Sequence, residues 1–288
     1  MDLKTEAGSE NNGGAKDSLL ARTVSSVQGL LALAFIMWVG LPLVIPTLIG
    51  LLWLATAELR DMLRHKGVEL NMHFLRFGGI VMLSFSLPQL YDTYPHIPWR
   101  EIALGLVLIG AFSYELLFGG NIQRFAYSLM AFIYVPWTLG FFLLLRYLPN
   151  AEQGIWTLTL PLIASFATDT GAYIVGRRYG RHKLAPTISP GKTVEGSVGG
   201  ILFSFVALLA YAGIVSEAFP FGWVELLVVS LVLSLAAQLG DLTESMLKRY
   251  CGVKDSGSFL PGHGGLLDRM DSLLFSVPIT FYLQVIFS

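Results

Sequence analysis

Long apolar runs, separated by short polar connections, dominate the pattern of the chain. About 20 apolar residues in a helix cross the roughly 30 Å hydrocarbon core of a bilayer. The pattern therefore predicts an all-α polytopic membrane protein with about nine transmembrane helices. The predicted spans cover residues 27–42, 44–59, 73–90, 102–119, 124–146, 155–176, 197–215, 223–243 and 267–286.

The first two predicted spans belong to one apolar stretch, from Leu30 to Ala57. This stretch is too long for one crossing. Pro42 and Pro46 interrupt it, and prolines at such a point suit a tight connection between two helices.

Positive charge is distributed unevenly among the connections. If the N-terminus is cytoplasmic, 17 of the 19 Lys and Arg residues fall on the cytoplasmic side, and Arg100 and Arg146 fall outside. Cytoplasmic loops of membrane proteins carry this excess of Lys and Arg. One span more or fewer in the middle would destroy the asymmetry, so it supports both the count and the orientation, and it places the C-terminus outside.

Composition agrees with a membrane protein and excludes other classes. The 288 residues are 54% hydrophobic and 14% charged, whereas soluble proteins carry about 25% charged residues. A net charge of -1 gives no field that suggests a nucleic-acid partner. The single cysteine, Cys251, excludes an intramolecular disulfide and a cysteine-cluster metal site.

Three regions follow from these patterns. Residues 1–26 are polar and are expected to form a disordered tail. Residues 27–150 are expected to hold about five transmembrane helices, and residues 151–288 a catalytic region with about four.

Aspartates interrupt three of the predicted spans. An aspartate at mid-membrane costs about 2.5–3.5 kcal/mol on insertion scales. Asp169 and Asp241 lie about 12 Å and 10 Å from the cytoplasmic ends of their helices, and Asp268 and Asp271 share one helix face. The pattern predicts one water-filled pocket, open to the cytoplasm and lined by carboxylates. The alternative is a set of buried pairs with Lys or Arg that lock the bundle.

The residues around these acids suggest the ligands. Carboxylate oxygens suit hard cations such as Mg²⁺, and neighbouring basic residues suit phosphates. The stretch "PGHGG" leads into the last span, so Gly264 and Gly265 are expected to offer free backbone N–H groups to a phosphate. His263 could contact a phosphate or transfer a proton, or it could be a solvated loop side chain.

A second glycine-containing stretch is "ISPGKTVEGS", residues 188–197. It is not a Walker A motif, because Pro186 stands where the first glycine would be and no strand precedes it. Ser189, Lys192 and Thr193 are nevertheless suitable phosphate ligands before a helix start, and Glu195 could bind substrate or act as an ordinary capping acid. "GSVGG", residues 196–200, predicts close helix packing within the bundle, with a dimer face as the alternative.

The C-terminal half resembles a known family. "SMLKRYCGVKDSGSFLPGHGGLLDRMDS", residues 245–272, contains in order Lys-Arg, Lys-Asp, His-Gly-Gly and Asp-Arg-x-Asp. Together with "TDTGAY" and "SPGKTVEGS" upstream, it resembles the signature of the CDP-diacylglycerol synthases, or phosphatidate cytidylyltransferases. The resemblance covers about 165–275 and is specific because the signature is long and unusual in composition.

The resemblance implies an activity. Members transfer CMP from CTP to phosphatidic acid, producing CDP-diacylglycerol and pyrophosphate for phospholipid synthesis. They require Mg²⁺, have a place for a second cation such as K⁺, and form homodimers. A multi-pass protein of the bacterial inner (plasma) membrane is therefore expected, with its active site on the cytoplasmic side.

The resemblance also implies residue roles. Asp241 and Asp268 match the metal-binding acids of the family, with Asp169 and Asp271 alongside. The residues that match phosphate- or substrate-holding positions are Lys192, Lys248, Arg249, Lys254, Asp255 and Arg269.

Two alternatives remain open at this point. A CTP-dependent polyprenol kinase would release CDP instead of pyrophosphate. A cation-coupled transporter also places aspartates within the membrane, but it predicts binding elements near the bilayer midplane and inverted repeats. Here the acids lie toward one face and no repeat is visible.

Overall fold

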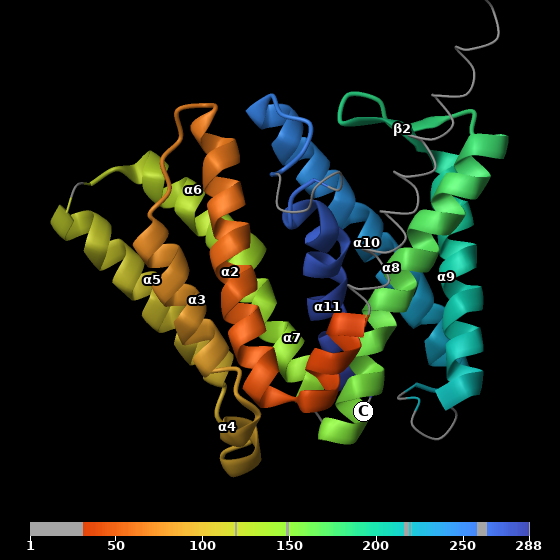
Figure 1. The fold of residues 1–288 in the computed structure, drawn as a ribbon, viewed down its shortest axis with the longest axis horizontal. Helices are drawn as coiled ribbons and strands as arrows, with labels where there is room; N and C mark the ends of the chain where they lie inside the picture. Colours follow the sequence, from red (N-terminus) through yellow and green to blue (C-terminus); the bar gives the residue numbers. More distant parts are fainter. Residues whose placement is uncertain are drawn as a thin grey trace, which may run out of the picture.

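The protein is a bundle of helices with one small hairpin (Figure 1). The computed structural model describes residues 31–118, 120–147, 150–215, 219, 221–257 and 264–287. The predicted polar tail over residues 1–26, and His263, lie outside the described residues.

The helices follow the apolar runs. A helix over residues 31–39 precedes the labelled elements. The labelled elements are α2 (Leu41–Arg64), α3 (Met72–Ser84), α4 (Pro88–Thr93), α5 (Trp99–Phe118), α6 (Ile122–Phe132), the π-helix η1 (Ile133–Trp137), α7 (Thr138–Tyr147), α8 (Ala151–Tyr179), β1 (Lys183–Ala185), β2 (Ser189–Thr193), α9 (Val194–Val215), α10 (Trp223–Cys251) and α11 (Leu267–Phe287).

Local sequence signals explain where several helices begin and end. Asn71, Asn121 and Asn150 each accept a hydrogen bond from the backbone N–H three residues later, which caps the starts of α3, α6 and α8. Thr193 does the same for the Gly196 N–H at the start of α9. Gly252, with φ +75°, ends α10 in the left-handed conformation that glycine adopts without strain.

Seven helices of the described chain are long and apolar enough to cross a membrane. They are Leu41–Arg64, Trp99–Phe118, Ile122–Tyr147, Gln153–Tyr179, Val194–Val215, Trp223–Cys251 and Leu267–Phe287. The all-α polytopic membrane class is therefore confirmed, whereas the count of nine is not.

The two remaining predicted spans are described only in part or are divided. Residues 31–39 are helical up to Gly40, where φ is +84° and the chain turns into α2. The run predicted at 73–90 is divided into α3, of 13 residues, and α4. A helix of 13 residues is about 20 Å long, which is less than the hydrocarbon thickness.

The strands β1 and β2 correct the expectation of helices alone. They pair antiparallel, with Lys183 opposite Thr193 and Ala185 opposite Ser189. They lie in the stretch expected to be a polar connection, where Gly and Pro obscure the alternation that marks a strand. The hairpin brings Ser189 and Lys192 back over the end of α8.

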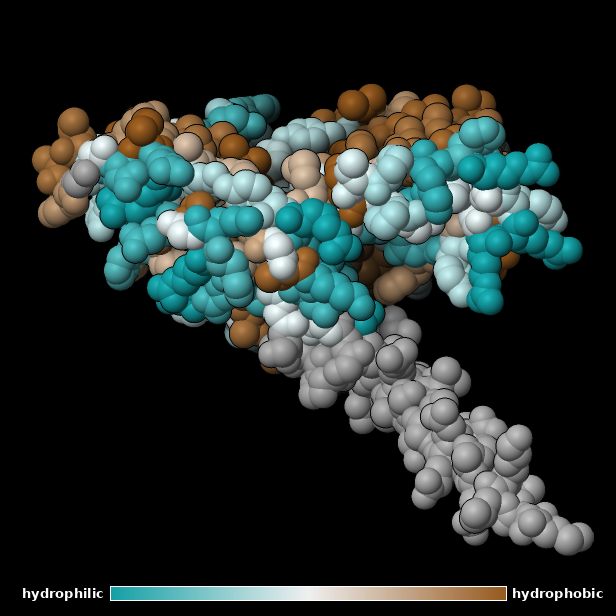
Figure 2. Space-filling view, turned by 90° about the horizontal axis from the view of Figure 1, so that it is seen from above, coloured by the Kyte–Doolittle hydropathy of each residue, from teal (hydrophilic) through white to brown (hydrophobic). Residues whose placement is uncertain are grey.

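Polar connections gather at one end of the bundle. The α2–α3 turn, the β1–β2 hairpin and the connection between α10 and α11 lie at the upper end in Figure 1, and α4 and the C-terminus lie at the lower end. Seen from above, this end carries many hydrophilic side chains bordered by hydrophobic ones (Figure 2). This gathering of hydrophilic side chains at one end agrees with the predicted grouping of polar connections on one side of the bundle.

Glycines allow close packing between α8 and α9. A Cβ at Gly199 would lie 2.5 Å from the Val175 side chain, and one at Gly200 would lie 2.9 Å from the Thr168 carbonyl oxygen. The prediction of close helix packing within the bundle at "GSVGG" is therefore confirmed.

The hydrophobic core joins the two halves of the chain. One buried cluster includes Leu52 and Leu59 of α2 together with Leu247 of α10 and Leu274 of α11. A second cluster is formed mainly by α8, α9 and α10. The division of the chain near residue 150 stays a prediction.

Candidate active site

Three mutually packed helices bring the predicted acids to the end that carries the polar connections. Asp169 lies on α8, Asp241 on α10, and Asp268 and Asp271 on α11. The helices α10 and α11 meet closely, because a Cβ at Gly240 would lie only 2.3 Å from the Asp271 carbonyl oxygen. Asp169 and Asp241 line the same cavity.

A polar cavity of about 590 Å³ lies between α8, the hairpin, α9 and α10. The predicted residues that line it are Asp169, Ser189, Lys192, Thr193 and Asp241. Lys192 Nζ lies 2.6 Å from Asp241 Oδ2, so the hairpin is tied to α10 across the cavity. The cavity thus joins "TDTGAY" and "SPGKTVEGS" with Asp241 of α10, four residues before the longest motif.

Lys248 forms the centre of a second charged cluster. Its Nζ donates to Glu244 Oε2 at 2.5 Å and to Asp268 Oδ1 at 2.6 Å. The three side chains are largely shielded, with exposed fractions of 13% for Lys248, 1% for Glu244 and 14% for Asp268. One ammonium group therefore neutralises parts of two carboxylates in a nearly buried setting.

The other oxygen of Asp268 is held by the chain around it. Asp268 Oδ2 accepts hydrogen bonds from the Ser256 N–H at 2.8 Å, the Ser256 hydroxyl at 2.9 Å and the Gly265 N–H at 2.8 Å. A Cβ at Gly264, which has φ +79°, would lie 2.7 Å from this oxygen. The carboxylate is therefore fixed in orientation, with Oδ1 directed to Lys248.

The backbone amides at the start of α11 correct one prediction. The Gly265 N–H is donated to Asp268, and the Leu266 and Leu267 N–H groups are donated to Glu58 of α2. The Gly265 N–H is therefore not free for a phosphate, which corrects the prediction for that residue, while the role of Gly264 stays a prediction. Sequence alone cannot reveal the bonds to Glu58, because Glu58 is about 200 residues away.

The donor set fits a cation although no preformed ligand group is found. Among the described residues, no three Asp, Glu, His or Cys side chains stand in a metal-binding arrangement. Lysine ammonium groups lie between or beside the carboxylates instead. Glu244 Oε1 is buried and has no hydrogen-bond partner in the described part of the chain, which leaves an acceptor available to a hard cation.

Other predicted residues are placed differently. The Glu195 carboxylate accepts from the Arg181 and His182 N–H groups and lies 2.6 Å from His182 Nδ1, which ties the hairpin to α9. Arg249 Nε donates to the Ile188 carbonyl oxygen at 3.2 Å. Lys254, Asp255 and Arg269 are exposed around the α10–α11 connection. Their substrate roles stay predictions.

Three residues near the site escaped the sequence analysis. Glu58 and Ser256 hold the start of α11. Tyr134, on the π-helix, is 8% exposed, and its buried hydroxyl has no hydrogen-bond partner among the described residues. The sequence offers two signals: Glu58 is an acid near the end of an apolar run, and Ser256 directly follows Lys-Asp.

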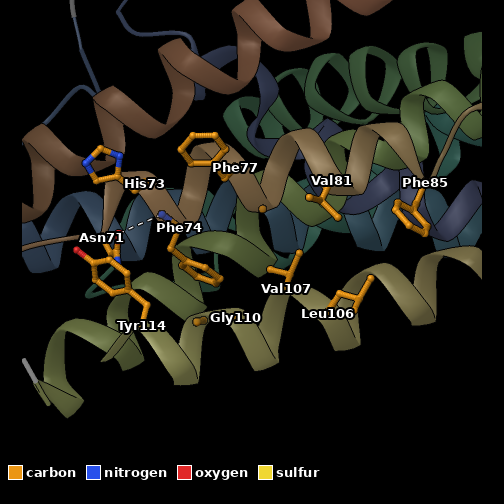
Figure 3. A pocket seen from close by; sticks show the side chains of 12 residues that line it. Asn71, His73, Phe74, Phe77, Val81, Phe85, Leu106, Val107, Gly110 and Tyr114 are labelled. Carbon is orange, nitrogen blue, oxygen red and sulfur yellow. Dashed lines mark hydrogen bonds between the residues drawn. The ribbon is translucent and has the colours of Figure 1, made fainter. Parts of the chain in front are cut away.

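A second cavity, of about 400 Å³, has a different character. It is an apolar groove between α3 and α5, where Phe74 and Val81 face Leu106 and Val107 (Figure 3). Polar side chains, including His73, occur only toward one end. None of its lining residues is acidic or a lysine, so the charged chemistry belongs to the cavity at α8, α9 and α10.

Comparison with known proteins agrees with the motifs. The model of the cytidylyltransferase family matches residues 20–287. A phosphatidate cytidylyltransferase of Bacillus subtilis is 35% identical over 272 residues, covering 93% of this chain and 98% of the relative. Proteins of the same name from Staphylococcus saprophyticus and Staphylococcus aureus strain COL are 39% and 37% identical over 221 residues, 73% of this chain and 81% of each relative. The family predicted from the motifs is thereby confirmed, and the chain belongs to the cytidylyltransferase family.

Proposed function

We propose that this protein is a phosphatidate cytidylyltransferase, which converts CTP and phosphatidic acid into CDP-diacylglycerol and pyrophosphate. The observation that carries the proposal is the convergence of acids from α8, α10 and α11 with Lys192 and Lys248 at one end of the bundle. The names of the relatives point to the same reaction.

The reaction needs two anionic substrates to approach each other. A phosphate oxygen of phosphatidic acid attacks the α-phosphorus of CTP in line, and the bond from that phosphorus to the oxygen of the leaving pyrophosphate breaks. A phosphate monoester has a second pKa of about 6, so the attacking oxygen is already anionic near neutral pH. The protein therefore has no need of a strong general base, and its task is positioning and charge neutralisation.

The residues divide this task. Lys192, on strand β2, reaches into the cavity, where its ammonium group can pair with a phosphate in place of Asp241. Lys248 is held between Glu244 and Asp268 and places a positive charge between these two carboxylates. Ser189 and Thr193 line the same cavity and supply hydroxyl groups for phosphate oxygens.

A divalent cation completes the site in this proposal. The acids that would hold Mg²⁺ and a second cation such as K⁺ are Asp169, Asp241, Asp268 and Asp271, with Glu244 beside them. When bound, Mg²⁺ supplies positive charge that stabilises the phosphates during transfer. Hydrogen bonds would fix the orientation of these carboxylates, as the backbone N–H groups of Ser256 and Gly265 do for Asp268.

The finer topology is part of the proposal. The end with the polar connections, which carries many hydrophilic side chains (Figure 2), would face the cytoplasm, where CTP is found, and the phosphate of a lipid would enter the site from the head-group layer. The seven long helices would cross a bacterial inner membrane, and nine crossings would also need α3 and α4 together and the run that contains residues 31–39. A homodimer is also proposed, to be tested by mass measurement in detergent.

The test is an assay of purified protein with phosphatidic acid, Mg²⁺ and CTP labelled at either the α or the γ phosphate. We expect α label in the lipid and γ label in released pyrophosphate, and loss of both upon chelation of Mg²⁺. Lipid that carries the γ label would instead identify a CTP-dependent lipid kinase and overturn the proposal.

A further inference from the structure

Glu58 of α2 makes an unusual long-range contact with the catalytic half. Its Oε1 accepts the Leu266 N–H at 2.8 Å, and its Oε2 accepts the Leu267 N–H at 2.9 Å. Oε2 also lies 3.1 Å from the Ser256 hydroxyl. Both oxygens of one carboxylate from the N-terminal half are therefore committed to the segment in which Asp268 lies.

The hydrogen bonds of Glu58 are strengthened by their position at the start of a helix. The first N–H groups of a helix have no partner within the helix, and the helix dipole adds partial positive charge there. A carboxylate that accepts two such N–H groups forms charge-assisted hydrogen bonds, which are roughly twice as strong as neutral ones. Glu58 thus fixes the start of α11 from outside the helix.

The Ser256 hydroxyl links Glu58 to Asp268. Its oxygen lies 3.1 Å from Glu58 Oε2 and 2.9 Å from Asp268 Oδ2, and it accepts the Asp268 N–H at 3.3 Å. A hydroxyl has one hydrogen to donate, so the two carboxylates share it. The position of Asp268 therefore depends on the same small group of atoms that binds Glu58.

Two glycines of the α10–α11 connection leave space for the Glu58 carboxylate. A Cβ at Gly257 would lie 2.8 Å from Glu58 Oε1, and a Cβ at Gly265 would lie 2.6 Å from Glu58 Oε2. A side chain at either position would displace Glu58 or the loop. Glycines on both sides of the α10–α11 connection thus allow the backbone to close around Glu58.

We propose that Glu58 is a positioning residue for Asp268, which rests on the function proposed above. Glu58 holds Ser256 and the first amides of α11, and these hold Asp268 Oδ2 so that Oδ1 faces Lys248. The N-terminal half thereby controls the geometry of the catalytic half through one carboxylate.

The test compares Glu58→Gln with a matched control, Asp61→Asn. Gln keeps the size of Glu but has only one oxygen for the two N–H groups. Asp61 lies three residues later on the same helix, is 57% exposed and pairs with Arg60, so its loss should leave activity unchanged. Glu58→Asp, which keeps the charge and shortens the reach, serves if the Gln variant does not fold.

Two readouts separate positioning from support of the fold. Hydrogen exchange of a peptide over residues 264–270 should become faster in Glu58→Gln, while a peptide from the second half of α11 keeps its wild-type rate. In the assay, kcat should fall about 10–100-fold, as is typical when a partner of a metal-binding carboxylate is lost. The Mg²⁺ concentration for half-maximal activity should rise, while the KM for CTP changes little.

Different results have different meanings. Faster exchange with wild-type kcat and Mg²⁺ dependence would overturn the positioning role and leave Glu58 as a structural contact. Unchanged exchange would show that the contact with α11 is absent. A wild-type protein that transfers no α label to lipid would instead refute the proposed function, and this is seen before any substitution is made.

Discussion

Two shielded ion-pair regions in this protein use the same kinds of residue but differ in how completely the charges are matched. In the N-terminal half, Arg124 of α6 donates to both oxygens of Glu115 on α5, at 2.9 Å and 2.7 Å. In the C-terminal half, Lys248 is shared by Glu244 and Asp268, and Glu244 Oε1 is left without a partner among the described residues.

The difference separates a structural pair from a binding site. A bidentate Arg–carboxylate pair satisfies its own charges and joins two neighbouring helices. Around Lys248, by contrast, the acids exceed the bases, and neither Asp169 nor Asp271 forms a salt bridge with another described residue. A surplus of shielded carboxylates must either take up protons or bind a further cation. A buried ion pair alone therefore does not indicate an active site, whereas unmatched acids beside a cavity favour a cation-binding site.

The largest expected effect comes from removing a charge in the unmatched region. Asp268→Asn and Asp241→Asn should each lower kcat at least about 100-fold, which corresponds to about 2.7 kcal/mol. Pyrophosphate release measures the rate, and circular dichroism in detergent checks that the helices remain. Near-normal turnover in either variant would contradict the assignment of these acids.

A smaller effect is expected at the edge of the polar cavity. Lys192→Ala removes the ammonium group that reaches Asp241 across the cavity. A hydrogen bond to a charged group contributes about 1.5–3 kcal/mol, so kcat/KM for CTP should fall roughly 10–100-fold, mainly through KM. If the CTP kinetics are unchanged, the nucleotide does not bind beside Lys192.

The matched pair should respond in stability and hardly in activity. Glu115→Gln leaves Arg124 without its bidentate partner. We expect a decrease of about 2–4 °C in the melting temperature for each kcal/mol lost, with kcat/KM close to wild type. A large decrease in kcat with an unchanged melting temperature would mean that the two regions do not differ in the way described.

The smallest effect is expected in the apolar groove. Gly110→Ala adds a methyl group where no atom lies within 4 Å of the new Cβ. Alanine favours a helix over glycine by about 1 kcal/mol, so the protein should be slightly more stable and equally active. A clear loss of activity with phosphatidic acid would show that this groove takes part in lipid binding.

The sequence predicts the helices and the acids well because their signals are local. Apolar runs of span length identify the long helices, and charges within such runs stand out, as Asp169 and Asp241 do. The division at Ser84 between α3 and α4 and the pairing of β1 with β2 are not visible in that way. They depend on turns and backbone pairing that hydropathy does not record.

The part of the site that escaped prediction depends on contacts distant in sequence. Glu58 resembles any acid near the end of an apolar helix, and its meaning appears only when α2 packs beside the start of α11. The amides of Gly264 and Gly265 are expected to be free, but the Gly265 N–H is donated to Asp268. A motif can suggest which residues meet a ligand, but it cannot show that another carboxylate has already taken a neighbouring donor.

The most direct test of the account is to measure Mn²⁺, used in place of Mg²⁺, bound to the purified protein in the presence of CTP by electron paramagnetic resonance. The account predicts that the wild type binds Mn²⁺ and that Asp268→Asn and Asp241→Asn bind it much more weakly, while Glu115→Gln binds it as the wild type does. Equal Mn²⁺ binding by all four proteins would contradict the claim that the acids of α10 and α11 hold the cation.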